Sequence, residues 1–283
     1  MSSIRHITVL GAGTMGHGIA HASMLAGYET RLYDVSDPQL QKARKQIDGI
    51  LKKAVELGKL AVSDVDATLG RLTTTSDLAA ALTDTHFIIE AAPERMDLKL
   101  KLFAEIERHA PASAVIGSNT SALSITEMAG SLKTPSRVGG MHFFNPVQKM
   151  KLIEIVRALE TSDATLEAIE GVSKAMGKET VLVRESPGFI TSRVNATIGN
   201  EAFYMLHEGV ASARDIDKAL KLGLNHPMGP FELVDLVGLD TRLSILEYLH
   251  KSLGEKYRPC PLLVQYVKAG RLGKKVGKGV YEY

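Results

Sequence analysis

A glycine-rich hexapeptide near the start of the chain limits the possible fold more than any other feature. Gly11-Ala-Gly-Thr-Met-Gly16 follows an apolar run at 4–10 and opens a helical pattern at 15–26, and Asp34 ends the next strand-like run at 29–33. GxGxxG alone occurs by chance in turns. A strand before it, a helix after it and an acidic residue about 20 positions on are the fingerprint of a dinucleotide-binding β-α-β unit.

Each glycine of this turn has a physical task. Gly11 permits the tight turn, Gly13 lets the backbone approach a pyrophosphate, and Gly16 allows the helix to pack closely on the strand, with the phosphate charge at the helix N-terminus. Asp34 is the expected acceptor for the ribose hydroxyls of adenosine, and its charge would repel a 2′-phosphate. The sequence therefore predicts NAD as cofactor in preference to NADP.

Strand-like and helical runs alternate through the first two thirds of the chain, which is typical of parallel strands covered by helices. Further strands are predicted at 71–75, 86–90, 114–118, 137–143, 151–156 and 180–183, and helices at 38–57, 95–109 and 163–176. After Pro187-Gly188 only helical patterns follow. We expect an α/β fold: a Rossmann-type doubly wound sheet with extra strands over residues 1–185, then an all-α C-terminal domain over 186–283.

Composition excludes several classes of function. A net charge of +2, 5% aromatic residues and no tryptophan argue against a nucleic-acid partner. The single cysteine, Cys260, cannot form an intramolecular disulfide, and no Cys/His cluster has metal-ligand spacing, so we expect no metal and a reducing compartment. No stretch reaches the roughly 20 apolar residues of a membrane helix. These features favour a cytoplasmic protein without a membrane partner.

The segment 141–155 places a histidine and a carboxylate where they can meet. Residues 151–156 alternate as a strand does, and an antiparallel register centred on Gln148 sets His142 opposite Glu154, with Cβ atoms about 5 Å apart. The segment alone fits an interior histidine beside an edge charge equally well. A bound nicotinamide favours a base, because an alcohol loses hydride more easily when its hydroxyl proton leaves too; His142 would take that proton and Glu154 would fix its tautomer.

The region 231–249 is apolar around much of a helical circumference. Such a helix must be buried on several sides. The C-terminal domain could cover it, but so could a second copy of the chain, and symmetric dimers are the commonest oligomers. We expect a homodimer through this domain.

The whole chain resembles the L-3-hydroxyacyl-CoA dehydrogenases, and most of all their single-function 3-hydroxybutyryl-CoA dehydrogenase type. The resemblance rests on eight ordered motifs: GAGTMG at 11–16, ERMDLK at 94–99, SNTSALSI at 118–125, GMHFFNP at 140–146, KLIE at 151–154, PGF at 187–189, NHPMGP at 225–230 and GKGVY at 277–281.

The resemblance implies roles for individual residues. His142 matches the catalytic histidine, Glu154 its orienting glutamate, and Ser121 the serine that hydrogen-bonds the 3-oxygen of the substrate. The residues expected around the cofactor are Gly11, Gly13, Thr14, Met15, Gly16, Asp34, Glu94, Lys99, Asn119, Asn145 and Lys275. One position departs from the family pattern: Ser192 stands where an asparagine usually helps to hold the substrate or cofactor, and a hydroxyl offers fewer donors than an amide.

The resulting prediction is an NAD-dependent dehydrogenase of fatty acid metabolism. It would interconvert short-chain L-3-hydroxyacyl-CoA and 3-oxoacyl-CoA, such as 3-hydroxybutyryl-CoA and acetoacetyl-CoA. Two alternatives stand beside it: a dehydrogenase of the same fold acting on a hydroxy acid without CoA, and a non-catalytic NAD-binding protein.

Overall fold

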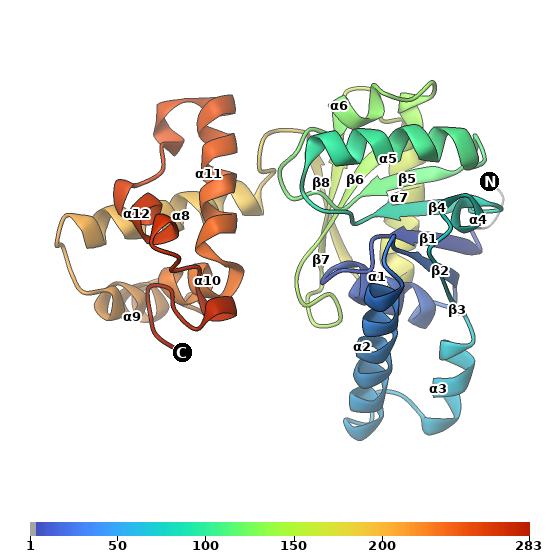
Figure 1. The fold of residues 1–283 in the computed structure, drawn as a ribbon, viewed down its shortest axis with the longest axis horizontal. Coiled ribbons are helices and arrows are strands. Elements are labelled where there is room, and N and C mark those ends of the chain that lie inside the picture. The colour runs from blue at the N-terminus through green and yellow to red at the C-terminus, as the bar shows by residue number, and fades with distance from the viewer. Residues whose placement is uncertain (1–3) are drawn as a thin grey trace. The chain divides into compact units, whose positions relative to one another are not determined.

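The computed structural model describes residues 4–283, which divide into two compact units. The first ends at Glu185 and the second begins at Ser186. The N-terminal unit contains a sheet with helices on both faces, and the C-terminal unit is built of helices (Figure 1). Among residues 4–283, none of the helices combines the length and apolar character needed to cross a bilayer.

One eight-stranded sheet organises the N-terminal unit, in the order β3-β2-β1-β4-β5-β6-β7-β8. The strands are β1 (His6–Leu10), β2 (Glu29–Tyr33), β3 (Leu72–Thr75), β4 (Phe87–Glu90), β5 (Val115–Ser118), β6 (Val138–Phe143), β7 (Leu152–Arg157) and β8 (Glu179–Arg184). The first six are parallel, whereas β7 pairs antiparallel with β6 and parallel with β8. The predicted doubly wound sheet with extra strands is confirmed, since β7 and β8 extend a parallel core in the opposite direction.

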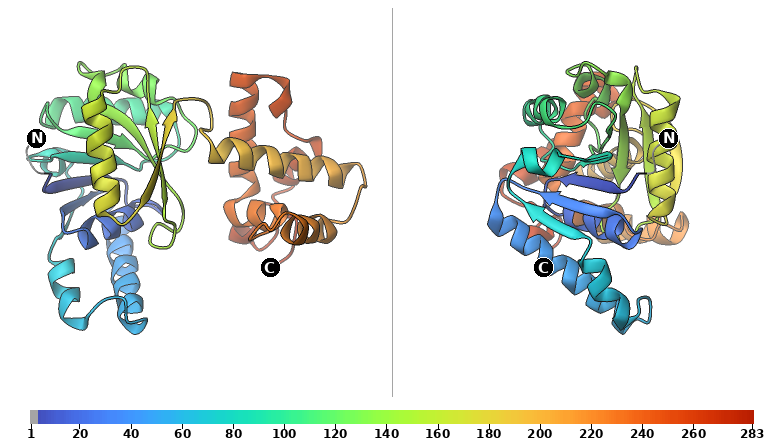
Figure 2. Two further views of the ribbon diagram at one scale, coloured as in Figure 1. Left: turned by 180° about the vertical axis from the view of Figure 1, so that it is seen from behind. Right: turned by 90° about the vertical axis from the view of Figure 1, so that its right-hand side faces the viewer.

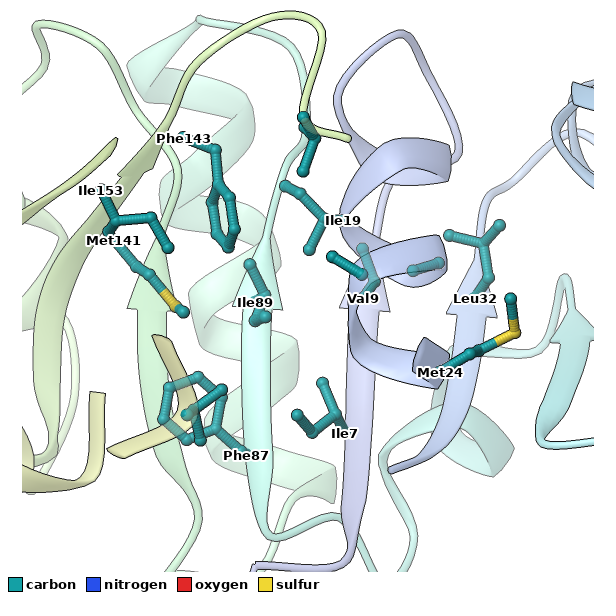
Figure 3. Packing of buried hydrophobic residues seen from close by; sticks show 14 of the residues in the cluster. Ile7, Val9, Ile19, Met24, Leu32, Phe87, Ile89, Met141, Phe143 and Ile153 are labelled. Carbon is teal, nitrogen blue, oxygen red and sulfur yellow. The ribbon is translucent and has the colours of Figure 1, made fainter. Parts of the chain in front are cut away.

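Successive side chains along a strand point to opposite faces of this sheet, and both faces are buried. Ile7 and Val9 of β1 belong to a core that includes Ile19 of α1 (Gly16–Leu25), as Figure 3 shows. The hydroxyl of Thr8, between them, donates to the Ala81 carbonyl of α4 (Leu78–Leu82). Helices therefore lie on opposite sides of the sheet, as Figure 2 also shows. The helices are α1 (Gly16–Leu25), α2 (Asp37–Glu56), α3 (Val62–Leu69), α4 (Leu78–Leu82), α5 (Met96–His109), α6 (Ile125–Ala129) and α7 (Asp163–Ala175), with a 3₁₀ turn at Pro135–Arg137.

Three short helices, α3, α4 and α6, are absent from the sequence prediction. Each has eight residues or fewer, which gives too few turns for an apolar period to be recognised. Two of them carry a local signal that sequence reasoning could have used. Asp77 caps α4 by accepting from Ala80 N, and Ser124 caps α6 by accepting from Glu127 N.

The C-terminal unit consists of α8 (Thr191–His207), α9 (Ala213–Gly223), α10 (Pro230–Val237), α11 (Leu239–Leu253) and α12 (Pro261–Lys268), with 3₁₀ turns at Glu255–Tyr257 and Lys274–Val276. The prediction of a single helix at 231–249 is wrong. Gly238 has φ +108°, a conformation that glycine adopts readily, and it separates α10 from α11. Phe203 and Phe231 meet edge to face at 5.2 Å within the core of this unit.

Candidate active site

The glycine-rich turn between β1 and α1 fits a dinucleotide. Gly11 has φ +105°, and a Cβ there would lie 2.6 Å from the Ala91 carbonyl oxygen; a Cβ on Gly16 would lie 1.6 Å from the Gly11 oxygen. Both glycines are required by the fold itself. A Cβ on Gly13, in contrast, would meet nothing within 4 Å, so the space beside it is left open by the protein. That open side is what the approach of a pyrophosphate requires.

The start of α1 adds to this fit. Met15 precedes the helix without a side-chain cap, and no acidic residue occupies the first turn. His17 N donates to the Gly13 carbonyl at 3.3 Å, but no side chain caps this end of the helix, and the helix dipole favours an anion there. Thr14 lies in the turn between Gly13 and Met15.

Asp34, directly after β2, ties the turn to the second strand. Its two carboxylate oxygens accept from Ala12 N at 2.8 Å and Ser36 N at 3.0 Å. Each oxygen can accept a second hydrogen bond, so the group keeps capacity for ribose hydroxyls. Arg31, the nearest candidate to attract a 2′-phosphate, donates instead to the Thr83 carbonyl. This arrangement favours NAD over NADP.

His142 and Glu154 form a buried pair on neighbouring strands. The ladder of β6 and β7 sets them directly opposite each other, which is the register predicted from the sequence. His142 Nδ1 lies 2.7 Å from Glu154 Oε2, and the residues are 5% and 0% exposed. Because a carboxylate only accepts, Nδ1 carries a proton, and in the neutral imidazole the lone pair lies on Nε2. Phe144 packs against the imidazole with ring centroids 4.6 Å apart.

Asn119 and Ser121 lie in the loop that follows β5. Asn119 Oδ1 accepts from Phe143 N at 2.9 Å, so this loop is joined to the strand end that carries His142. The backbone N–H of Ser121 donates to Glu94 Oε1 at 2.8 Å. The β5 loop, the β6 end and the segment after β4 thus meet at the C-terminal edge of the parallel strands, where doubly wound sheets bind their ligands.

Lys99 is buried rather than open to a ligand. Its side chain is 1% exposed, and its ammonium lies 2.5 Å from Glu90 and 3.6 Å from Glu94. Glu90, the last residue of β4, is fully buried and also accepts from the Ser118 hydroxyl at 2.5 Å. Sequence reasoning missed Glu90 and Ser118. The available signal was an acidic residue ending the apolar strand Phe-Ile-Ile-Glu.

The remaining predicted residues lie in the loop after β6 or in the C-terminal unit. Asn145 is exposed in the loop after β6. Ser192 is half-buried in the first turn of α8. Lys275 forms an ion pair of 2.6 Å with Asp240 in the C-terminal unit. Among residues 4–283, no three His, Cys, Asp or Glu side chains converge to hold a metal ion.

Comparisons with known proteins extend over the whole chain. Residues 6–186 match the model of the 3-hydroxyacyl-CoA dehydrogenase NAD binding domain, and residues 188–283 match the C-terminal domain of the same family. A probable 3-hydroxybutyryl-CoA dehydrogenase of Bacillus subtilis is 45% identical over 281 residues, with 99% of this chain and 98% of that protein covered. A 3-hydroxybutyryl-CoA dehydrogenase of Bradyrhizobium diazoefficiens is 42% identical, with 99% and 96% covered. The crystal structure of an (S)-3-hydroxybutyryl-CoA dehydrogenase of Ralstonia eutropha superposes with a TM-score of 0.95 at 42% identity, covering 99% of each chain.

Proposed function

The chain belongs to the 3-hydroxyacyl-CoA dehydrogenase family, an NAD-dependent family of oxidoreductases, and from this premise we propose that it interconverts (S)-3-hydroxybutyryl-CoA and acetoacetyl-CoA. The observation that carries the proposal is the buried His142–Glu154 pair at 2.7 Å. The names of relatives more than 40% identical over nearly the whole chain support the short acyl group.

In the proposed reaction His142 is the general base. Its Nε2 lone pair takes the proton of the 3-hydroxyl group during oxidation and returns it during reduction. Glu154 holds the tautomer and stabilises the imidazolium that forms, and a positioned base of this kind is worth about 10²- to 10⁴-fold in rate. The Ser121 hydroxyl would hydrogen-bond the same oxygen. NAD, when bound, supplies the acceptor for the hydride that leaves C3.

We propose that residues of the N-terminal unit hold the cofactor. The turn at 11–16 meets its pyrophosphate, and Asp34 its adenosine ribose. The further proposed contacts with the dinucleotide are Glu94, Asn119 and Lys275, and Asn145 is proposed to lie near the nicotinamide amide. Because Lys99 is buried against Glu90, its charge would act on the cofactor through Glu94 rather than by direct contact.

Ser192 is proposed as a contact for the substrate thioester. It begins a helix in the C-terminal unit, and it stands where asparagine is usual in the family. One hydroxyl cannot donate and accept in the two places that an amide reaches, so the grip on the thioester would be weaker or would use water.

A substrate panel tests the function. NADH or NADPH would be oxidised with acetoacetyl-CoA, with longer 3-oxoacyl-CoA esters and with free oxo acids, and NADH with acetoacetyl-CoA should give the highest kcat/KM. Higher activity with a free acid would favour the alternative of a dehydrogenase that does not use CoA. NADH binding without any turnover would favour a non-catalytic protein.

His142→Gln tests the base in the same assay. Turnover should fall by about 10²-fold or more while NADH binding, measured by its fluorescence, is kept. A variant that retained more than about a tenth of the wild-type kcat would refute the assignment.

We also propose a homodimer. Exposed leucines at the ends of two helices of the C-terminal unit, Leu222, Leu224 and Leu236, support it, because a partner chain would remove them from water. Sedimentation should give the mass of two chains, and the mass of one chain would contradict the proposal.

We further propose that this enzyme of fatty acid metabolism is located in the cytoplasm. The buried, free Cys260 is in keeping with the reducing conditions there.

A further inference from the structure

The buried ion pair of Glu90 and Lys99 joins three elements near the loop that carries Ser121. Glu90 ends β4, and its Oε1 accepts from Lys99 Nζ at 2.5 Å and from Ala92 N at 2.7 Å. Its Oε2 accepts from Ser118 Oγ, at the end of β5, at 2.5 Å. Lys99 lies in the first turn of α5 and also donates to the Ala92 carbonyl at 3.2 Å. Glu90 therefore connects β4, β5 and α5 at the C-terminal edge of the sheet.

Stability alone is a weak reason for such a pair. Removing two charges from water costs several kcal/mol, and well-packed apolar residues often replace a buried ion pair without loss of stability. A charged pair with this many fixed partners does, however, define the positions of the groups that bond to it. The neighbours of the pair are therefore the place to look for its role.

Those neighbours lead directly to Ser121. On one side, Lys99 lies 3.6 Å from Glu94, whose Oε1 accepts from Thr120 Oγ1 at 2.6 Å and from Ser121 N at 2.8 Å. On the other side, Ser118 Oγ, held by Glu90, accepts from Thr120 N at 3.3 Å. The backbone around Ser121 is thus held by Glu94 directly and by Glu90 through Ser118. Lys99 lies between the two carboxylates.

We propose that Glu90 and Lys99 are positioning residues that act through Ser118 and Glu94 to fix the backbone of Ser121. Glu90 is fully buried and Lys99 is 1% exposed, so neither is placed to touch substrate directly. The proposal rests on the proposed function, in which the Ser121 hydroxyl bonds the reacting oxygen. A displacement of about 1 Å at such a group can cost on the order of 10²-fold in rate.

The first test combines Glu90→Gln with Ser121→Ala. Glu90→Gln alone should lower kcat by about 10- to 100-fold with acetoacetyl-CoA, and KM should change by less than about threefold. If Glu90 acts through Ser121, the double variant should be no slower than Ser121→Ala beyond about twofold, because the two losses are not independent. Losses that multiply would overturn the proposal.

Glu90→Gln leaves Lys99 without its buried counter-charge, and the variant could fail to fold for that reason. Two milder changes test the proposal in that case. Ser118→Ala keeps both charges and removes the hydroxyl that donates to Glu90, accepts from Thr120 N and contacts the Met128 sulfur. Glu90→Gln combined with Lys99→Met removes both charges and leaves no unpaired ion. Both variants should keep their secondary structure and still lose kcat non-additively with Ser121→Ala; wild-type kcat in both would overturn the proposal.

A matched control exists on the same helix. Glu107, near the C-terminal end of α5, forms a 2.7 Å ion pair with the buried Arg137 at the opposite edge of the sheet. Glu107→Gln should lower the melting temperature and leave kcat unchanged. An equal loss of kcat in Glu107→Gln would show that any weakening of α5 has the same effect, and it would refute a specific role for Glu90.

Amide hydrogen exchange separates this proposal from the proposed function. The N–H groups of Ser121 and Ala122, which both donate to Glu94, should exchange at least about tenfold faster in Ser118→Ala without any substrate present. Unchanged exchange would overturn the positioning role even if the wild-type enzyme is active. Faster exchange in a protein that does not reduce acetoacetyl-CoA would sustain the positioning role and refute the substrate assignment instead.

Discussion

His21 in α1 should make the stability of the N-terminal unit depend on pH. The residue is 3% exposed, and neither ring nitrogen has a hydrogen-bond partner among residues 4–283. Burial, with smaller contributions from the nearby charges of His17 and Lys178, lowers the pKa of His21 from 6.5 to about 4. The folded protein therefore disfavours the protonated ring that the unfolded chain accepts.

The sign and size of the effect follow from that difference. A folded-state pKa below the unfolded value means that the stability contribution is complete above about pH 6.5 and is lost as the pH falls toward 4. The gap of about 2.5 pH units, at about 1.36 kcal/mol each, amounts to about 3.4 kcal/mol when the loss is complete. At pH 5 the free energy of unfolding should already be lower by about 2 kcal/mol.

Urea unfolding followed by circular dichroism, with His21→Leu beside the wild type, measures this contribution. At pH 7.5 the variant should equal or exceed the wild type, because leucine removes two unpaired polar atoms from the interior. At pH 5 its advantage should grow by about 2 kcal/mol, since other titrating groups cancel in the difference. His207→Gln, at an exposed site in the other unit, should keep the wild-type dependence. Parallel curves for the wild type and His21→Leu would refute the reasoning.

Three further predictions concern the site. Glu154→Gln should lower kcat by about 10²- to 10⁴-fold with little change in NADH affinity, because the amide no longer fixes the imidazole tautomer; steady-state kinetics checks this. Ser192→Asn should change KM for acetoacetyl-CoA and leave kcat within about threefold, and a change in kcat alone would contradict a substrate contact. Gly13→Ala should melt like the wild type but bind NADH more weakly in titration calorimetry, whereas Gly16→Ala, whose Cβ would lie 1.6 Å from the Gly11 oxygen, should lower the melting temperature.

Much of the N-terminal unit could be predicted because its signals are local. Residues 29–33 read as a strand and form β2 with the same ends, and the long helix expected at 38–57 is α2. Features decided by a single backbone angle could not be predicted in this way. An isolated glycine is tolerated within a helical pattern, so residue 238 gave no firm sign of the break between α10 and α11.

In the site, too, local features could be predicted from the sequence and contacts between distant segments could not. The opposition of His142 and Glu154 followed from the two-residue period of a strand, which leaves few registers for a buried carboxylate. The burial of Lys99 did not follow from any pattern, because its partner Glu90 ends one strand and Ser118, which donates to Glu90, ends another. Sequence spacing cannot show that Glu90 lies beside Lys99 and Ser118 until the order of the strands in the sheet is known.

The antiparallel pairing of β6 and β7 also has a consequence for how the chain tolerates change. His142 and Glu154 keep their distance through ladder hydrogen bonds between the strands, and the exposed residues Gln148 and Lys149 of the connection only return the chain. Insertions there should leave the pair intact as long as the ladder keeps its register, since loops absorb added residues at small entropic cost. A shift of the ladder by one residue would turn Glu154 to the opposite face of the sheet. Protein engineers could therefore lengthen the loop at Gln148 and Lys149, but should keep Phe144 and Asn145 before it and the strand pairing itself.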